Sequence, residues 1–169
     1  MQRRIPLYPS GIVPIIQGQE SNATLTRRHV VKNPEETALP KARILVIEDD
    51  EALARQVKSH LERAGHDVHV ENAGRPAIGY ANSNRVDLVV LDIRLPDLSG
   101  YDVCVELRRL YQPTILPVVI LTGLNQPKHQ AQGFAHGAEA YLTKPVQTVD
   151  LLGTVAVMLH RAGSRKQVA

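Results

Sequence analysis

Residues 42–57, with the sequence ARILVIEDDEALARQV, join an apolar run to a cluster of acids and then to a helical pattern. The run at 44–47 is typical of a strand that is covered on both faces, as in a parallel sheet. Four acids follow it directly: Glu48, Asp49, Asp50 and Glu51. Two explanations are open at this point. The acids begin a solvated helix, whose dipole favours negative charge there, or they are gathered to hold a cation.

The same alternation of short apolar runs and amphipathic stretches continues from Lys41 to the end of the chain. We expect five strands, at 43–47 (RILVI), 67–71 (DVHVE), 86–91 (VDLVVL), 116–121 (LPVVIL) and 139–142 (EAYL). The second run alternates as an edge strand does, whereas the first, third and fourth are apolar almost throughout. Strands that alternate with crossover helices predict an α/β fold: a doubly wound five-stranded parallel sheet, flavodoxin-like in its order 2-1-3-4-5, with helices on both faces.

Helical spacing and stop signals lie between the predicted strands. In the first helix, apolar residues recur every four positions: Leu53, Val57 and Leu61. Gly65 then supplies a C-terminal stop, Ser99 is a suitable N-cap before a second apolar repeat (Val103, Leu107, Leu110), and the last helix begins near Thr148. The fourth helix, KHQAQGFAHG at 128–137, is short and contains a glycine, so we expect it to be the most mobile.

The composition limits the class of protein. A chain of 169 residues with 43% hydrophobic content can form one packed domain and an appendage. No window approaches the ~18 consecutive apolar residues of a membrane span, and the N-terminus lacks a secretory pattern, so we expect a cytoplasmic protein without membrane insertion. The lone Cys104 excludes an internal disulfide and is expected to be a buried filler. A net charge of +3, scattered along the chain, disfavours direct binding of nucleic acid.

The two ends of the chain differ from its middle. Residues 1–40 are rich in proline and show no persistent helical or strand period, which predicts a flexible, disordered N-terminal arm. Residues 163–169 are expected to form a basic C-terminal tail, which leaves 41–162 as the folded domain. We interpret the basic residues at both ends as solvated, with a docking role as the alternative.

Polar residues follow the predicted strands at the same edge of the sheet. Glu48 and Asp49 end the first strand, and Asp92 ends the third. Thr122 ends the fourth, and Lys144 follows the fifth. In a doubly wound sheet, ligands bind beyond these ends at the point where the strand order reverses, here between strands one and three. The carboxylates, the hydroxyl and the ammonium should therefore lie together.

This set of groups permits one kind of chemistry in particular. Three neighbouring carboxylates repel one another unless a cation compensates, and oxygen ligands suit Mg²⁺, whereas the His and Cys ligands of a zinc site are missing. Next to a metal and Lys144, a carboxylate becomes usable as a nucleophile toward a phosphoryl group. Asp92 is the best candidate because it lies on the middle strand. Thr122 and Lys144 would bind phosphate oxygens of the acyl phosphate. Each feature alone is common, and their joint occurrence in this order supports the hypothesis.

The stretches ILVIEDDE (44–51), VVLDIRLPDLSG (89–100), VVILTG (118–123) and GAEAYLTKPV (137–146) closely resemble, in order and spacing, the receiver domain of bacterial two-component response regulators. The resemblance covers roughly residues 42–162. It implies that Asp92 is the phosphoacceptor. It further implies that Asp49, beside Glu48, is a direct Mg²⁺ ligand and that the backbone carbonyl of Arg94 is another. Thr122 and Lys144 become the pair that senses the phosphate.

The resemblance also implies a switch and an output face. Tyr141 is expected to turn inward when Thr122 moves toward the phosphate, and the Lys144–Pro145 bond is expected to be cis. The output face would be formed by the fourth helix, fifth strand and fifth helix, including Lys128, His129, Gln132 and Tyr141. At two positions this chain departs from the commonest pattern of the family, or the family has no fixed residue there. Arg94 is a bulky cation that can reach the phosphate, and Gly123 is small, which should leave the phosphate accessible to a partner.

The function implied is that of a phosphoacceptor in a phosphorelay. The phosphoryl group would come from a phosphohistidine on a sensor histidine kinase or histidine phosphotransfer protein, with Mg²⁺, and the output would be contact with a downstream protein, as a stand-alone regulator or relay intermediate. Beyond accepting and slowly losing its own phosphoryl group, the chain is not expected to be an enzyme. The histidines, among them His60, His66 and His160, show no catalytic spacing and look like surface residues.

Three alternatives stay open. One is a receiver-like interaction module that no longer takes up phosphate, and another is a fragment of a hybrid histidine kinase or of a longer regulator. A hydrolase that turns over an aspartyl phosphate is the third alternative. Such enzymes usually place a second acid two residues after the nucleophile, where this chain has Arg94.

Overall fold

The computed structural model describes residues 41–111 and 115–166. The predicted arm at 1–40 and the last three residues lie outside these ranges, so the arm stays a prediction. The start of the predicted basic tail at 163 falls inside the last helix, which runs as far as Lys166. In the described part of the chain, no helix combines the length and the apolar character needed to cross a membrane.

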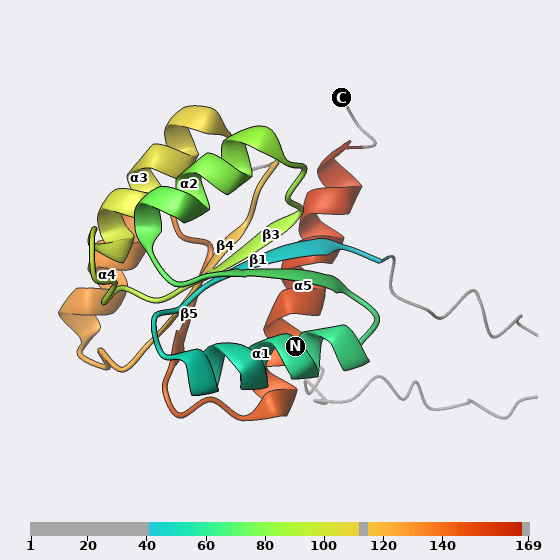
Figure 1. The fold of residues 1–169 in the computed structure, drawn as a ribbon, viewed down its shortest axis with the longest axis horizontal. Coiled ribbons are helices and arrows are strands. Elements are labelled where there is room, and N and C mark those ends of the chain that lie inside the picture. The colour runs from blue at the N-terminus through green and yellow to red at the C-terminus, as the bar shows by residue number, and fades with distance from the viewer. Residues whose placement is uncertain (1–40, 112–114, 167–169) are drawn as a thin grey trace, which may run out of the picture. The chain divides into compact units, whose positions relative to one another are not determined.

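The strands and helices alternate along the chain as the sequence predicts (Figure 1). They are β1 (Arg43–Ile47), α1 (Glu51–Arg63), β2 (Asp67–Glu71), α2 (Gly74–Ser83), β3 (Leu88–Leu91), α3 (Gly100–Leu110), β4 (Val118–Thr122), α4 (Pro127–Ala135), β5 (Ala140–Thr143) and α5 (Thr148–Lys166). All neighbouring strands are parallel, and their order in the sheet is β2-β1-β3-β4-β5. The predicted fold class and strand order are therefore confirmed.

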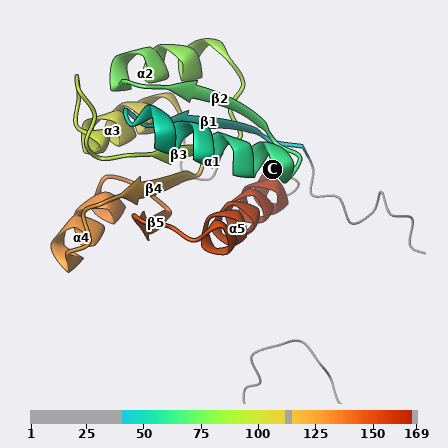
Figure 2. The ribbon, with the colours of Figure 1, turned by 60° about the horizontal axis from the view of Figure 1, so that its bottom comes forward.

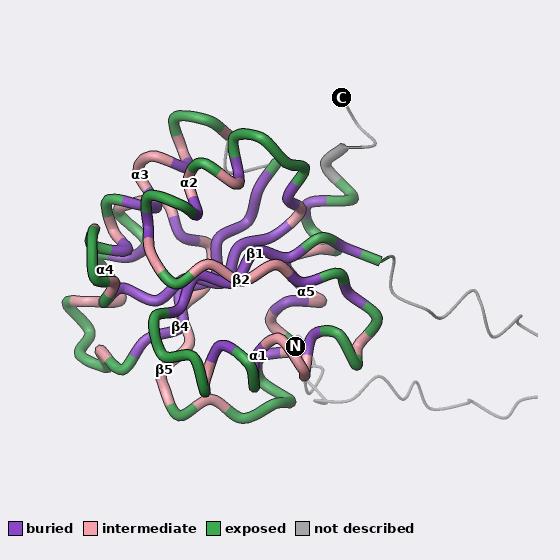
Figure 3. The backbone as a smooth tube through the Cα atoms, viewed as in Figure 1, coloured by how far each residue is buried: buried purple, intermediate pink, exposed green. Residues whose placement is uncertain are grey.

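The sheet lies between two layers of helices. Buried side chains of α2 and α3 form one apolar cluster with one face of the sheet, and those of α1 and α5 form a second cluster with the other face. Along β3, Val89 and Leu91 belong to the first cluster, and Leu88 and Val90 to the second. Figure 2 shows α1 beside α5, and Figure 3 shows the buried strands between the helices. Such double burial is why these strands are apolar without alternation.

The helix ends confirm several predicted signals. Asp50 is the N-cap of α1, where its side chain accepts hydrogen bonds from the amides of Ala52 (2.9 Å) and Leu53 (3.1 Å). Ser99 caps α3 by accepting from the amide of Tyr101 at 3.3 Å. Gly65 ends the turn after α1 with φ of +93°, a conformation that favours glycine. The last two acids of the opening cluster therefore belong to the start of a helix.

The glycine of α4 has a packing role. Gly133 is the buried residue of this helix, and a Cβ there would lie 2.7 Å from Cδ1 of Ile120 and 3.2 Å from the ring of Tyr141. The helix has no side-chain cap at Gln126. Gly133 therefore lets α4 approach the sheet closely, which the sequence pattern alone did not indicate.

Three residues test the predictions of burial. Cys104 is fully buried, as predicted, and burial raises the pKa of its thiol to about 11. Leu110, counted in the apolar repeat of its helix, is 42% exposed because it lies in the last turn of α3. His66 was expected at the surface, and that prediction is wrong: the residue is buried directly after Gly65, and its Nδ1 has no hydrogen-bond partner among the described residues.

We expect Gly100→Ala to destabilise the fold. A Cβ at this position would lie 2.2 Å from the carbonyl oxygen of Asp92 and 2.7 Å from Cα of Ile93, and the backbone cannot yield cheaply there. The free energy of unfolding, measured with urea and circular dichroism, should fall by about 1–3 kcal/mol. Gly79→Ala is the matched control: the position is exposed in α2 with open space around it, and alanine should stabilise that helix by about 0.5–1 kcal/mol. Equal effects of both variants would contradict this account of Gly100.

We also expect His66 to make the fold sensitive to acid. Burial lowers the pKa of His66 below its ordinary value of 6.5. As pH falls through that ordinary value, the unfolded chain binds the proton before the folded chain does, so stability is lost toward low pH. The loss of unfolding free energy between about pH 7.5 and pH 5.5 should therefore be smaller in His66→Phe than in the wild type. His160→Phe, at an exposed position, controls for the removal of a histidine. Parallel pH profiles for the wild type and His66→Phe would refute the expectation.

Candidate functional site

The acidic side chains meet at the carboxyl ends of β1 and β3. Ile47 pairs with Leu91 in the register of these strands, so Glu48 and Asp92, which follow them, lie side by side. One carboxylate oxygen each from Glu48, Asp49 and Asp92 lie within 4.8 Å of one another. Glu48 and Asp92 are buried, whereas Asp49 is exposed. The predicted clustering of the three acids is therefore present in the structure.

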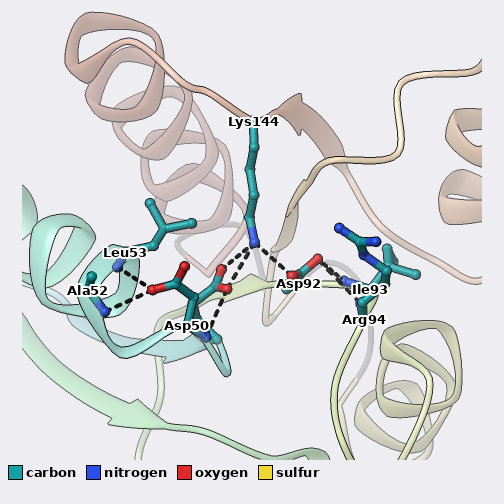
Figure 4. A network of polar contacts seen from close by, with 8 residues as sticks. Asp50, Ala52, Leu53, Asp92, Ile93, Arg94 and Lys144 are labelled. Carbon is teal, nitrogen blue, oxygen red and sulfur yellow. Dashed lines mark hydrogen bonds and ion pairs between the residues drawn. The ribbon is translucent and has the colours of Figure 1, made fainter.

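Lys144 contacts both buried acids, and Figure 4 shows its side chain reaching Asp92. Its Nζ is 2.7 Å from Oε2 of Glu48 and 2.6 Å from Oδ2 of Asp92. The backbone holds its position, because the Lys144 amide donates to the carbonyl of Thr122 at 2.8 Å. The bond between Lys144 and Pro145 is cis, as expected. A lysine that follows the edge strand β5 thus neutralises acids on β1 and β3.

Burial affects the charge of Glu48. Loss of water around its carboxyl group raises the pKa above the ordinary value of 4.5, and the neighbouring charge of Asp92 acts in the same direction. The hydrogen bond and the positive charge of Lys144 lower the pKa and offset part of this rise. Since three carboxylates lie in this cluster beside the single ammonium of Lys144, the arrangement favours binding of a further cation.

The backbone after Asp92 orients its carboxylate. Oδ1 accepts hydrogen bonds from the amides of Ile93 (2.6 Å) and Arg94 (3.3 Å), while Oδ2 contacts Lys144. The side chain of Arg94 reaches toward β4, and its guanidinium lies 3.5 Å from where a Cβ of Gly123 would be. The space expected beside Gly123 is therefore bordered by a cation.

Thr122 and Tyr141 lie on neighbouring strands, at the positions predicted for them. Thr122 is fully buried at the end of β4, and its hydroxyl has no hydrogen-bond partner among the described residues. Tyr141 is half-buried on β5, and its hydroxyl donates to the carbonyl of Leu124 at 2.5 Å. Burial raises the pKa of Tyr141 to about 12. This tyrosine is therefore packed and hydrogen-bonded and is not a loose residue at the sheet edge.

The residues expected on the output face differ in exposure. Lys128 and Gln132 are exposed on α4. His129 is half-buried, and its carbonyl accepts a hydrogen bond from the hydroxyl of Tyr101 at 3.2 Å. Together with Tyr141 on β5, these residues lie on adjacent elements.

One acidic residue near the site, Asp97, was not predicted from the sequence to have a role. Asp97, in the loop between β3 and α3, accepts hydrogen bonds from the amides of Gly74 (2.7 Å) and Arg75 (2.8 Å) at the start of α2. The sequence contains only an indirect sign of this contact. Ala73, which precedes α2, has no side-chain acceptor to cap the helix. A helix start without its own cap indicates that a residue elsewhere in the chain caps it, but it does not identify that residue.

The donor atoms suit a hard divalent cation. Carboxylate oxygens converge from Glu48, Asp49 and Asp92, and the described residues offer no histidine or cysteine beside them in the cluster. Mg²⁺ prefers oxygen ligands and retains waters, so a few carboxylates and a backbone carbonyl suffice for it.

Comparison with known proteins agrees with this geometry. The family model for the response regulator receiver domain matches residues 44–156. The chain is 39% identical over 127 residues to the DNA-binding dual master transcriptional regulator RpaA of Synechocystis, which covers 75% of this chain and 53% of that protein. It is 34% identical over 120 residues to the alkaline phosphatase synthesis transcriptional regulatory protein PhoP of Bacillus subtilis, with 71% and 49% covered. The chain thus spans about half the length of these curated relatives.

Solved structures show the same fold. A CheY-like response regulator receiver domain protein from Methanospirillum hungatei aligns with a TM-score of 0.70 and 26% identity, over 74% of this chain and 98% of that one. The receiver domain of the Francisella response regulator 1452 aligns with a TM-score of 0.67 and 31% identity, over 72% and 98%. Together with the match to the family model, these similarities show that the chain belongs to the receiver domain family of two-component response regulators.

Proposed function

We propose that the chain accepts a phosphoryl group on Asp92 from a phosphohistidine of a partner protein and signals through contacts with other proteins. The observation that supports this most directly is the Lys144 ammonium, which lies between Asp92 and Glu48 at the carboxyl edge of the sheet. A nucleophile, a cation for the phosphoryl oxygens and a cluster of metal-binding acids thus occupy one small region. The proposed donor is a sensor histidine kinase or a histidine phosphotransfer protein.

The acids and the loop after Asp92 would hold Mg²⁺. The proposed ligands are Asp49, Asp92 and the backbone carbonyl of Arg94, with Glu48 adding negative charge beside them. When bound, Mg²⁺ supplies positive charge to the phosphoryl oxygens and so makes attack by an anion feasible. The chain's own contribution is the position of each group: buried Asp92 is oriented by the amides of Ile93 and Arg94 before any partner arrives.

The proposed reaction transfers one phosphoryl group. A carboxylate oxygen of Asp92 forms a bond to phosphorus while the P–N bond to the partner's imidazole breaks, and the electron pair of that bond returns to the ring nitrogen. Lys144 then has a phosphoryl oxygen as a new partner close to the carboxylate that it already contacts. Thr122, whose buried hydroxyl lacks a partner among the described residues, has a donor available for another oxygen.

The proposed output passes through α4, β5 and α5. Lys128, His129, Gln132 and Tyr141 would change position or exposure when Thr122 moves, and a downstream protein would recognise the difference. The relative from Synechocystis, RpaA, is named a DNA-binding regulator, but this chain matches about half of its length. For the matched region we propose protein contacts, in the cytoplasm where kinases of this class present their phosphohistidine.

The first test is chemical. With Mg²⁺ and acetyl phosphate, the intact mass should increase by one phosphoryl group, and Asp92→Asn should show no increase because the amide is a poor nucleophile. Asp102→Asn, which removes an exposed acid on α3, should behave as the wild type does. No adduct on the wild type would refute the proposal, and repeated turnover of acetyl phosphate without an adduct would favour the hydrolase instead.

Replacing Lys144 should separate its role as the cation that stabilises Glu48 and Asp92 from its proposed role in phosphoryl transfer. In Lys144→Met, the buried Glu48 and Asp92 lose their shared cation, so without Mg²⁺ the free energy of unfolding should fall by about 3–5 kcal/mol. Mg²⁺ should stabilise this variant more than the wild type, because the ion no longer competes with an ammonium. The phosphoryl adduct should form more slowly.

The control for Lys144 is Lys41→Met, an exposed lysine at the other end of β1. Thermal unfolding with and without Mg²⁺ checks both variants. If Mg²⁺ stabilises Lys144→Met no more than it stabilises the wild type, the competition between metal and lysine does not exist.

A further inference from the structure

The loop between β3 and α3 is closed tightly at its base. Arg94 and Ser99 form an isolated antiparallel bridge, and the amide of Gly100 donates to the carbonyl of Ile93 at 2.8 Å. Residues 95–98 therefore project from this base as a short turn. The turn is joined through Arg94 to the site, because the Arg94 amide bonds to Asp92 and the Arg94 carbonyl is a proposed Mg²⁺ ligand.

The tip of this turn is anchored to a different helix. Asp97 uses both carboxylate oxygens, Oδ1 for the amide of Gly74 at 2.7 Å and Oδ2 for the amide of Arg75 at 2.8 Å. These hydrogen bonds, with that of Arg75 the largest influence, hold the pKa of Asp97 below its ordinary value. Asp97 is exposed, so water weakens these hydrogen bonds, but a charged acceptor with two amide donors still forms stronger hydrogen bonds than a neutral acceptor does.

The start of α2 is built to receive this carboxylate. Its N-cap is Ala73, which forms no side-chain cap bond, so the first amides of α2 are free for an acceptor from outside the helix. Gly74 lets the helix end approach closely: a Cβ there would lie 2.6 Å from Cγ2 of Val103 and 3.1 Å from Cβ of Leu98. The start of α2, the turn at 95–98 and α3 are therefore in direct contact. By binding the start of α2, Asp97 fixes the turn against these two packed helices.

We propose that Asp97 is a positioning residue: by binding the amides of Gly74 and Arg75 it holds the loop from Arg94 to Ser99, and so keeps the carbonyl of Arg94 placed for Mg²⁺. This inference rests on the proposed function, because it assumes that the acids and this carbonyl bind the metal. It assigns α2 a role in the site, although no residue of that helix is among the proposed ligands. The competing explanation is that Asp97 serves only as a helix cap and stabilises α2.

A pair of substitutions separates these explanations. Asp97→Ala removes both hydrogen bonds. Adding Ala73→Asp gives α2 an acid at its own N-cap, where the backbone is already extended (φ −151°, ψ 156°), and restores the net charge. The double variant therefore offers the Arg75 amide an acceptor on α2 itself without anchoring the loop, while Pro76, the next residue, has no amide hydrogen to cap. Asp97→Asn, which keeps one oxygen acceptor, is the conservative variant, and Asp102→Ala controls for the loss of an acid on α3.

The measurements are the Mg²⁺ dissociation constant from an NMR titration of backbone amides, hydrogen exchange of the Gly74 and Arg75 amides, and the free energy of unfolding. In Asp97→Ala the dissociation constant should rise by about tenfold, as expected when a residue that supports a metal ligand is removed. Exchange at Gly74 and Arg75 should accelerate, and Asp97→Asn should lie between this variant and the wild type. In the double variant the stability should recover while the dissociation constant stays raised.

Other outcomes decide against the inference. If the double variant regains the affinity for Mg²⁺ together with the stability, Asp97 is a helix cap only. The same holds if Asp97→Ala binds Mg²⁺ as the wild type does. A wild type that binds Mg²⁺ and forms the phosphoryl adduct while the Asp97 variants do so equally well overturns this inference alone. A wild type that binds no Mg²⁺ overturns the proposed function as well.

Discussion

Two carboxylates buried at the ends of neighbouring parallel strands are the constraint on which this site depends. Glu48 and Asp92 are brought together by the register of β1 and β3, and both are nearly excluded from water. Such a pair is costly unless a cation compensates. Lys144 supplies that charge from β5, which is separated from β3 by β4. The lysine must therefore extend past the end of β4, where its own amide donates to the carbonyl of Thr122.

Much of this arrangement follows from patterns that act along the chain. Apolar runs in a strand–helix alternation determine the parallel sheet, and the sheet then brings the residues after β1, β3, β4 and β5 to one edge. The places of residues that directly follow a strand, such as Asp92 and Lys144, were predictable for this reason. The caps at Asp50 and Ser99 were recognisable because an N-cap bonds to amides within its own helix.

Features set by contacts between distant segments were not predictable in the same way. Asp97 caps a helix that begins more than twenty residues earlier in the chain, and only the folded chain brings the two together. His66 was expected at the surface because the histidines show no catalytic spacing, but the residue follows the turn at Gly65 and is buried in the fold. Gly133 suggested a weak helix, whereas the closeness of Ile120 and Tyr141 requires glycine at that place. In each case tertiary packing overrides a local tendency.

Thr122 and Tyr141 connect the proposed chemistry to the rest of the fold. A buried hydroxyl without a partner costs roughly 1–3 kcal/mol, and the Thr122 hydroxyl has no partner among the described residues. Under the proposed function, a phosphoryl oxygen would accept from this hydroxyl and remove the cost. Tyr141 is already satisfied by the carbonyl of Leu124, two residues beyond Thr122, so displacement of that segment would have to break or carry along the tyrosine's hydrogen bond. Under the proposed function, the free energy gained by satisfying the Thr122 hydroxyl would be comparable to that of the Tyr141 hydrogen bond, which is the scale needed for a phosphoryl group to displace the tyrosine.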